Sequence, residues 1–577
     1  MKKNELHISS FKKFIDILKL DRKDIFQIYF YAILAGILNL SLPLGIQAII
    51  SLIGGAQVST SLIIMIIVIT IAASLSGIFQ MIQLYISEKI QQRIFARISF
   101  QFADRLPKIK MEKLGKKYLP ELMNRFFDTI TLQKGLSKLL LDFSAAVLQT
   151  LFGVILLSLY HPYFIILGFS IVVVVYVIIR YTANKGMQTS LKESDHKYEM
   201  AFWLEETAKN ATTFKLAGIT DFIIEKTDEI ATKYVNARKK HFNILLSQYS
   251  TLVIFKTFII AGLLILGTIL VIQQRMNIGQ FVAAEIVIVL IIGSVEKLML
   301  SIETIYDVLT SVEKLDKINH LEVEQEKGEN FDSFIKEEAE GMEVSAHHLN
   351  FKFSDSKKLV IKDINFTIQK NERICVAGFN NSGKSTLLQL ISGLYTEFDG
   401  TITYNKIPIG NLKLETLRSH IGDSLSQETL FGGTLFDNIS MGRARADIEN
   451  VTWAIEQVGL TEFVENLPKG YNTLLDPQGR TLPLSIVRKI VLARSIADKP
   501  RLLVLEDTFF HLEKERMEKI KKLLFTDERP WTLVIASNDI EIANACDKVL
   551  IIKDGEILKY DRFRSLAEEP WFHKVFI

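Results

Sequence analysis

The sequence predicts two regions of different fold class: an α-helical domain of six transmembrane helices, followed by an α/β domain. Three observations predict this division. Hydrophobic residues make up 49% of the 577 residues, and the mean hydropathy is +0.22. No charged residue occurs between Ile25 and Ser87. The composition changes after Asp316, and from about Met342 short apolar strands alternate with helical patterns, which is typical of α/β domains. The chain is also longer than one hydrophobic core usually serves.

The apolar stretches account for six membrane crossings, each of which needs about 20 residues. The first two lie near Ile25–Ile53 and Ser61–Ser87, and the next two share the uncharged stretch Phe143–Ile179, which YHPY divides. Helices five and six are centred on Thr257–Gln274 and Gln280–Leu300. A large soluble enzyme with buried core helices is the alternative. It is disfavoured because several of these runs approach or exceed the roughly 18 residues expected of a membrane span.

Basic residues in the connecting segments predict the orientation of these helices. Lys and Arg are dense in residues 1–24, Glu88–Lys138 and Arg180–Lys240, whereas the other loops hold almost none except Arg275. Segments rich in Lys and Arg stay on the cytoplasmic side. We therefore expect a multi-pass protein of the cytoplasmic (inner) membrane with both termini in the cytoplasm. The apolar run after the N-terminus is too long for a cleavable signal, so no secretory signal is predicted.

The remaining charges and cysteines argue against several other classes. The formal net charge of +3 gives no indication of nucleic acid as a partner. Cys375 and Cys546 are too few and too far apart in sequence for a disulfide framework or a zinc site. Lys256 and Glu285 fall near or inside predicted spans, where ionisable groups are costly and often line a pathway. An interfacial position is the other interpretation. We favour it for Lys256, and both interpretations stay open for Glu285.

The clearest functional motif is GFNNSGKS, which follows the predicted strand Arg373–Ala377 and precedes a helix. A phosphate-binding loop works in this context, because glycines let the backbone approach and N–H groups point at the phosphates. Lys384 is expected to reach the β- and γ-phosphates of ATP, and Ser385 to help hold Mg²⁺. The predicted ATP-binding residues of this motif are Gly378, Asn380, Asn381, Ser382, Gly383, Lys384, Ser385 and Thr386.

These features divide the chain into four predicted segments. Residues 1–24 form a cytoplasmic amphipathic segment and residues 25–320 the six-helix transmembrane domain. Residues 321–341 are acidic and polar and are predicted to be a linker. Residues 342–577 form the nucleotide-binding domain.

Six membrane helices followed by such a domain resemble a half-transporter of the ATP-binding cassette (ABC) exporter family, over nearly the whole chain. Phe353, in the sequence FKF, is similar to the family's adenine-stacking aromatic residue, which is usually tyrosine. Gln427 falls in the Mg²⁺-sensing position of the family's glutamine loop. Ala454–Thr473 resembles the helical subdomain, and Val549–Ile557 the final strands. The resemblance thus implies an α/β P-loop domain with a helical subdomain.

The segment in place of the family's signature turn, Leu-Ser-Gly-Gly-Gln, departs from that pattern. Aligned backwards from IVLAR, this chain has Leu482, Pro483, Leu484, Ser485 and Ile486. Proline supplies no N–H, and the leucine and isoleucine add bulk where backbone should approach the γ-phosphate. Much of the signature's anion-binding surface is therefore expected to be lost.

The hydrolytic positions depart as well. Glu506 falls in the Mg²⁺-supporting place, and Asp507 in the place of the catalytic glutamate, one methylene shorter. Asn538 falls in the place of the switch histidine and cannot carry a proton or a charge. The resemblance assigns catalysis to Asp507, Asn538 and Gln427, and Mg²⁺ to Ser385, Gln427 and Glu506. We interpret the pattern as retained ATP binding without fast hydrolysis, and drift at weakly constrained positions is the alternative.

Family members pair their nucleotide domains head to tail, so the resemblance implies a homodimer or a heterodimer with a second half-transporter. Tyr118–Ser137 and Trp203–Gly218 resemble the intracellular loops of exporters of the hemolysin and bacteriocin secretion type. Too few residues precede the first helix for that group's peptidase domain, so leader-peptide cleavage is not expected. The residues expected near coupling contacts are Glu121, Asn124, Arg125, Glu205 and Glu206.

The predicted function is export of a peptide, a protein or another solute, powered by ATP. The secretion-type resemblance implies a periplasmic adaptor and an outer-membrane channel if the source has two membranes. Two alternatives stay open: a lipid or drug efflux half-transporter, and a nucleotide-gated scaffold of an envelope secretion complex.

Overall fold

The computed structural model describes residues 2–53, 60–115, 117–218, 220–325, 327–335, 340–425, 429–506, 514–526 and 531–576. The chain divides into two compact units. The helical unit comprises Met1–Pro107 and Tyr118–His320, and the α/β unit comprises Lys108–Lys117 and Leu321–Ile577.

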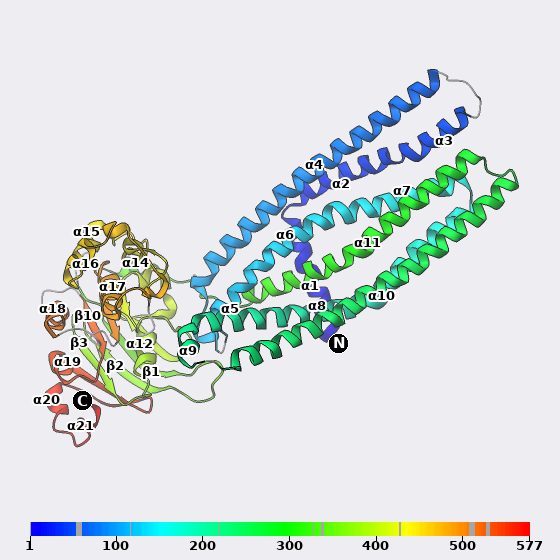
Figure 1. Ribbon diagram of the computed structural model, residues 1–577. Coiled ribbons are helices and arrows are strands. Elements are labelled where there is room, and N and C mark those ends of the chain that lie inside the picture. The colour runs from blue at the N-terminus through cyan, green and yellow to red at the C-terminus, as the bar shows by residue number, and fades with distance from the viewer. Residues whose placement is uncertain are drawn as a thin grey trace. The chain divides into compact units, whose positions relative to one another are not determined.

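Long helices make up the helical unit, and six helical stretches of the described chain are long and apolar enough to cross a membrane (Figure 1). The prediction of six membrane helices is therefore confirmed. The helices are α1 (Lys2–Lys19), α2 (Arg22–Asn39), α3 (Ser41–Ile53), α4 (Thr60–Arg105), α5 (Leu119–Met123), α6 (Asp128–Lys138), α7 (Ser144–Tyr160), α8 (Tyr163–Lys209), α9 (Ala211–Leu216), α10 (Phe222–Ile272) and α11 (Ile278–Asn319).

Helix α11 lies at the centre of the helical unit and packs against α3, α6, α7, α8 and α10. Small residues allow this close packing. A Cβ atom at Gly153 of α7 would lie 2.6 Å from Ile291, and one at Gly186 of α8 would lie 2.4 Å from the ring of Tyr306. Helices in lipid associate through such close contacts because the hydrophobic effect does not drive them together there.

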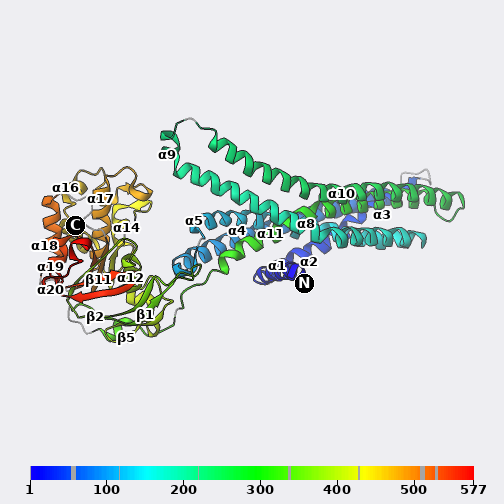
Figure 2. The same cartoon turned by 90° about the horizontal axis from the view of Figure 1, so that it is seen from below.

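Four helices, α4, α8, α10 and α11, are much longer than a membrane is thick. Helix α10 has 51 residues, or about 76 Å at 1.5 Å per residue, against about 30 Å of hydrocarbon. The charged segments of α4, α8 and α10 therefore extend well beyond their apolar parts. The short helix α9 connects the extended ends of α8 and α10 (Figure 2).

A six-stranded sheet forms the core of the α/β unit, in the order β12-β11-β3-β10-β9-β6. All its strand pairs are parallel except β11–β12, so the sheet ends in one antiparallel edge strand. The strands are β3 (Arg373–Gly378), β6 (Ile421–Ser424), β9 (Leu502–Glu506), β10 (Thr532–Ala536), β11 (Lys548–Lys553) and β12 (Glu556–Asp561).

A four-stranded antiparallel sheet, β2-β1-β4-β5, packs with the first sheet around one hydrophobic core. A second core lies under a helical subdomain. The remaining strands and the main helices of this unit are β1 (Val344–Phe351), β2 (Ile361–Ile368), β4 (Asp399–Tyr404), β5 (Ile407–Pro408), β7 (Gly433–Thr434) and β8 (Leu474–Leu475), which pair with each other, α12 (Lys384–Ile391), α14 (Leu435–Ser440), α15 (Ile448–Gln457), α17 (Leu484–Ile496), α18 (Lys514–Phe525) and α19 (Ile540–Ala545).

The acidic segment predicted as a linker contributes to the α/β unit. Val323 forms an antiparallel bridge with Ile109, and Glu324 forms an ion pair with Arg418. Phe331 is completely buried in the core beneath the four-stranded sheet.

Candidate nucleotide-binding site

The GFNNSGKS motif forms a loop between β3 and α12, as its sequence context predicts. Asn381 (φ +60°) and Gly383 (φ +105°) have left-handed backbone conformations, which turn the chain into the helix. A Cβ atom at Gly378 would lie 2.2 Å from the carbonyl oxygen of Ile552. Only glycine fits at Gly378, because the neighbouring strand β11 lies directly against it.

The side chains of the loop suit a bound phosphate chain. The Lys384 Nζ donates hydrogen bonds to the carbonyl oxygens of Gly378 (2.8 Å) and Phe379 (3.1 Å), at the start of the loop. Ser382 is 4% exposed, and its hydroxyl has no hydrogen-bond partner among the described residues. A buried hydroxyl without a partner is a donor that a phosphate oxygen can satisfy.

The predicted Mg²⁺ side chains meet at the end of strand β9. The Ser385 hydroxyl donates a hydrogen bond to Glu506, which is 6% exposed. Oxygen donors of this kind are the ligands that Mg²⁺ prefers. Thr386 is buried next to Ser385, whereas Asn380 and Asn381 are exposed on the loop. Two further predicted residues, Gln427 and Asp507, lie outside the described residues.

Asn538 contacts the phosphate loop itself. Its Oδ1 accepts a hydrogen bond from the Gly378 N–H (3.2 Å), and its Nδ2 donates one to the Gly378 carbonyl oxygen (3.0 Å). Both hydrogen-bonding atoms of the amide are therefore engaged by the backbone of a single residue.

Phe353 borders a hollow of about 640 Å³ in the α/β unit. Its ring makes edge-to-face contacts with Phe351 and Tyr395, which fix its position. Lys352 and Lys357 line the same hollow. Glu397 and Asp399 line it as well, so the hollow is mixed in charge, and the ring of Phe353 is the group in it that can stack on a nucleotide base.

The turn in place of the signature opens helix α17, whose N-cap residue is Pro483 and has no side-chain capping hydrogen bond. Leu484 is 49% exposed at the first position of the helix. Leu482 and Ile486 pack against the core of the helical subdomain. Ile486, which replaces the signature's glutamine, thus supports the subdomain together with Leu482, which matches the signature's own leucine, while Leu484 occupies the exposed tip.

Two family models match this chain. The ABC transporter transmembrane region matches residues 25–295, and the ABC transporter ATP-binding model matches residues 361–509. The chain belongs to the ABC transporters, since the two models together cover most of it. The second match places the phosphate loop in an ATP-binding domain.

Known proteins similar to this chain include a bacterial translocation protein. The alpha-hemolysin translocation ATP-binding protein HlyB of Escherichia coli is 24% identical over 369 residues, which cover 64% of this chain and 51% of HlyB. The uncharacterized ABC transporter ATP-binding protein YfiB of Bacillus subtilis (strain 168) is 28% identical over 259 residues, which cover 45% of this chain and 44% of YfiB. The chain spans about half the length of these curated relatives.

A solved structure confirms the predicted fold. The chain is similar to a bacterial Atm1-family ABC exporter with ATP bound, with a TM-score of 0.82 and 16% sequence identity. The similarity covers 96% of this chain and 97% of that one, so it includes both the helices and the α/β domain.

A segment that the sequence did not single out packs onto the α/β unit. Residues Lys108–Lys117 belong to the α/β unit. One carboxylate oxygen of Glu112 accepts hydrogen bonds from the Thr396 N–H and hydroxyl and from the Glu397 N–H, at 3.0–3.1 Å. Lys110 and Lys113 form ion pairs with Glu397. The sequence KMEKLGKK (residues 110–117) holds Lys110, Glu112 and Lys113, directly before the predicted coupling loop.

The ion pairs of this segment shift the pKa values of their members. Lys110 and Lys113 lower the pKa of Glu397, and Glu397 raises the pKa of Lys113. Opposite charges favour the ionised forms. The segment also reaches the hollow beside Phe353, because Glu112 and Lys113 line it.

The residues predicted near coupling contacts form a cluster in the helical unit. The Asn124 Nδ2 donates a hydrogen bond to Glu205 (3.1 Å), and Arg125 pairs with Glu121 (3.5 Å). Glu206 accepts hydrogen bonds from Asn210 at the end of α8. The cluster joins the first and second predicted intracellular loops.

Ionisable groups also meet between α10 and α11. Lys256 donates a hydrogen bond to Glu296 (3.2 Å), and the Tyr249 hydroxyl donates another to the same carboxylate (2.6 Å). Lys256 thus has a charged partner on the neighbouring helix. Glu285 lies on α11 with its side chain exposed.

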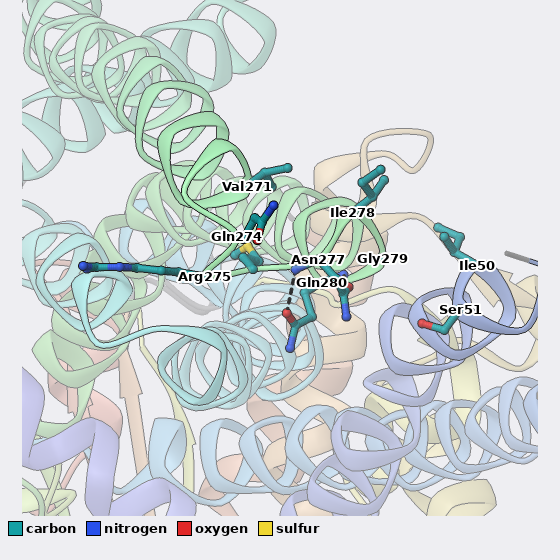
Figure 3. Close-up of a pocket in the computed structure, with 10 residues that line it drawn as sticks. Ile50, Ser51, Val271, Gln274, Arg275, Asn277, Ile278, Gly279 and Gln280 are labelled. Atoms are coloured by element: carbon teal, nitrogen blue, oxygen red, sulfur yellow. Dashed lines mark hydrogen bonds between the residues drawn. The ribbon is translucent and has the colours of Figure 1, made fainter.

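Arg275, the one basic residue of the loops expected to face outward, lies beside a hollow of about 870 Å³ (Figure 3). Ile50 and Ser51 at the end of α3 line the same hollow. The Asn277 side chain accepts a hydrogen bond from the Gln280 N–H (2.7 Å), and the Gln280 side chain accepts one from the Asn277 N–H (3.0 Å), which caps helix α11.

Proposed function

We propose that this chain is the ATP-binding subunit of an exporter that moves a peptide, a protein or another solute out across the cytoplasmic membrane. In this proposal ATP binds well and is hydrolysed slowly. One contrast carries it. The phosphate loop has the lysine, glycines and buried hydroxyl that bind phosphate, whereas Pro483 and Leu484 open the helix that should contact the γ-phosphate of a paired domain.

The chain's own residues account for binding. Gly378, Ser382, Gly383 and Lys384 would hold the phosphates, and Phe353 would stack on the base. Ser385 and Glu506 would hold Mg²⁺, together with Gln427. Bound ATP supplies the contacts that close two nucleotide domains on each other.

Slow hydrolysis follows in either kind of dimer. In a homodimer, each site would pair this phosphate loop with a defective signature turn. In a heterodimer with an intact partner, the hydrolytic residues Asp507 and Asn538 would fall in one site and Pro483 in the other. Neither site would then be complete, because head-to-tail pairing separates the two defects.

Relatives and charge pattern support the export role. HlyB and the toxin RTX-I translocation protein of Actinobacillus pleuropneumoniae are described as translocation ATP-binding proteins, which favours a polypeptide substrate. We propose a periplasmic adaptor and an outer-membrane channel as further partners where two membranes are present. Both termini would lie in the cytoplasm, because Lys and Arg concentrate in the segments on that side.

Restoring the family's residues tests the proposal. We expect the repaired chain in nanodiscs to hydrolyse ATP at least about tenfold faster than the natural chain, because one lost oxyanion donor or a base displaced by about 1 Å can each cost a hundredfold. The substitutions are Pro483→Ser, Leu484→Gly, Ser485→Gly, Ile486→Gln, Asp507→Glu and Asn538→His. Adding Lys384→Ala should abolish the gain. A natural chain as fast as the repaired one would refute slow hydrolysis.

A further inference from the structure

Asn538 extends the hydrogen-bonded ladder between strands β10 and β3. The last paired residues of the two strands are Ala536 and Val376, and the Ser537 N–H then donates a hydrogen bond to the Val376 carbonyl oxygen (3.2 Å). One residue further, the side chain of Asn538 takes over and bonds both the N–H and the carbonyl of Gly378. The primary amide therefore acts in place of a backbone peptide group.

This pairing requires an amide. Asparagine carries a donor and an acceptor side by side in one planar group, so both can face the same residue. The two ring nitrogens of histidine point toward different edges of the ring and cannot both face one peptide residue. The pairing with Gly378 thus suits asparagine and not the family's histidine.

The position of Gly378 gives the pairing a consequence for nucleotide binding. Gly378 is buried at the start of the phosphate loop, between Asn538 on one side and the Ile552 carbonyl on the other. Its carbonyl oxygen accepts hydrogen bonds from both the Lys384 Nζ (2.8 Å) and the Asn538 Nδ2 (3.0 Å). When Lys384 turns toward phosphate, Asn538 still satisfies this buried carbonyl, so releasing the lysine costs less.

We propose that Asn538 is a positioning residue that holds the start of the phosphate loop in its nucleotide-binding conformation and does not sense the γ-phosphate. This inference rests on the proposed function, in which the loop binds ATP. A residue that acts through the loop backbone affects ATP and ADP alike, because the loop surrounds phosphates that both nucleotides carry. A γ-phosphate sensor affects ATP alone.

The test compares two nucleotides on the full-length chain in nanodiscs. The non-hydrolysable ATP analogue AMP-PNP and ADP are titrated with Mg²⁺ present, and the two Kd values are measured for each variant. Asn538→Leu removes both hydrogen bonds at similar size, and Asn538→His introduces the family's residue. The matched control is Asn365→Leu, because Asn365 also bonds two backbone groups, the His348 N–H (2.8 Å) and the Asp363 carbonyl (2.9 Å), in the other sheet.

We expect Asn538→Leu to raise the Kd values of AMP-PNP and ADP by the same factor, about five- to thirtyfold, since it removes two hydrogen bonds. Asn538→His should also weaken both nucleotides equally, and Asn365→Leu should leave both Kd values within about twofold. Unchanged Kd values in both Asn538 variants would overturn the proposal, and so would a loss confined to AMP-PNP.

A folding control and a second variant distinguish a loss of nucleotide binding from a loss of folding. Thermal unfolding of the nucleotide-free variants identifies a folding defect. If Asn538→Leu fails to fold, the two Kd values of Asn538→His test the proposal. Equal losses for AMP-PNP and ADP support the positioning role, and a loss confined to AMP-PNP contradicts it. Robust ATP hydrolysis by the natural chain would refute slow turnover but not the positioning role, since AMP-PNP and ADP binding do not depend on hydrolysis.

Discussion

Glu506 is the one acidic side chain among the described residues that directly contacts Ser385 of the phosphate loop. We expect Glu506→Gln to weaken binding of Mg²⁺ with AMP-PNP about tenfold, because the metal loses a charged partner. Binding of the nucleotide without metal should change less than twofold. Titrating Mg²⁺ at fixed AMP-PNP measures the effect, with Glu462→Gln on the exposed helical subdomain as control. Equal losses with and without metal would contradict a role in holding Mg²⁺.

Some single residues could be identified from the sequence and others could not. Lys384, Ser385 and Gly383 lie in one contiguous motif, so the loop that they form follows from spacing alone. The pairing of Asn538 with Gly378 joins residues 160 positions apart, and it depends on how far the ladder of β10 and β3 extends. No local pattern encodes that register.

The docking of segment Lys108–Lys117 also could not be predicted from the sequence, because its contacts join residues far apart in the chain. Its helical turn Met111–Lys113 is short and polar, and Glu112 meets Thr396 across 284 positions. The first coupling loop predicted from the sequence begins at Tyr118, ten residues after Lys108, because the resemblance lies in the more regular helices that follow. The strands and helices themselves are predictable, since β3 is apolar from Ile374 to Gly378 and the first four spans carry no charged residue.

Charge reversal tests this docking. We expect Glu397→Lys to speed amide hydrogen exchange in residues 108–117 by at least about tenfold, because Lys110 and Lys113 would then face a third positive charge. Adding Lys113→Glu should restore part of the protection. Glu569→Lys, which breaks the exposed pair with Lys559 elsewhere in the unit, serves as control. Unchanged exchange in Glu397→Lys would rule out a holding role for these ion pairs.

The same pairs set a pH dependence. The pKa of Glu397 is lowered in the folded chain, so its ionised form stabilises docking above the ordinary glutamate pKa of about 4.3. This stabilisation is lost as the pH falls through the lowered pKa. We therefore expect protection of residues 108–117 to stay constant from about pH 8 to pH 5 and to decrease only in stronger acid. A decrease between about pH 8 and pH 6 would show that another group controls docking.

The helical unit ends in an exposed apolar tip where α9 joins the extended helices α8 and α10. Leu216 is 81% exposed and Phe222 is 55% exposed, and charged stretches of α8 and α10 separate both from the apolar parts of these helices. Contiguous exposed apolar groups mark contact sites. We expect Leu216→Arg to reduce the AMP-PNP-dependent dimer fraction at least about threefold by crosslinking. Val235→Arg, on the exposed face of α10, is the control, and equal dimer fractions in both variants would contradict a contact at α9.

ATP binding and ATP hydrolysis by the natural chain, measured side by side in nanodiscs, test directly whether it binds ATP but hydrolyses it slowly. We expect the natural chain to bind ATP with a micromolar or tighter Kd, and Lys384→Ala to abolish this binding. We expect its turnover to stay below about 0.1 per second, where typical enzymes exceed about 1 per second. ATP turnover above about 1 per second that Lys384→Ala abolishes would contradict slow hydrolysis, since Glu506, Asp507 and Asn538 would then form a working hydrolytic site.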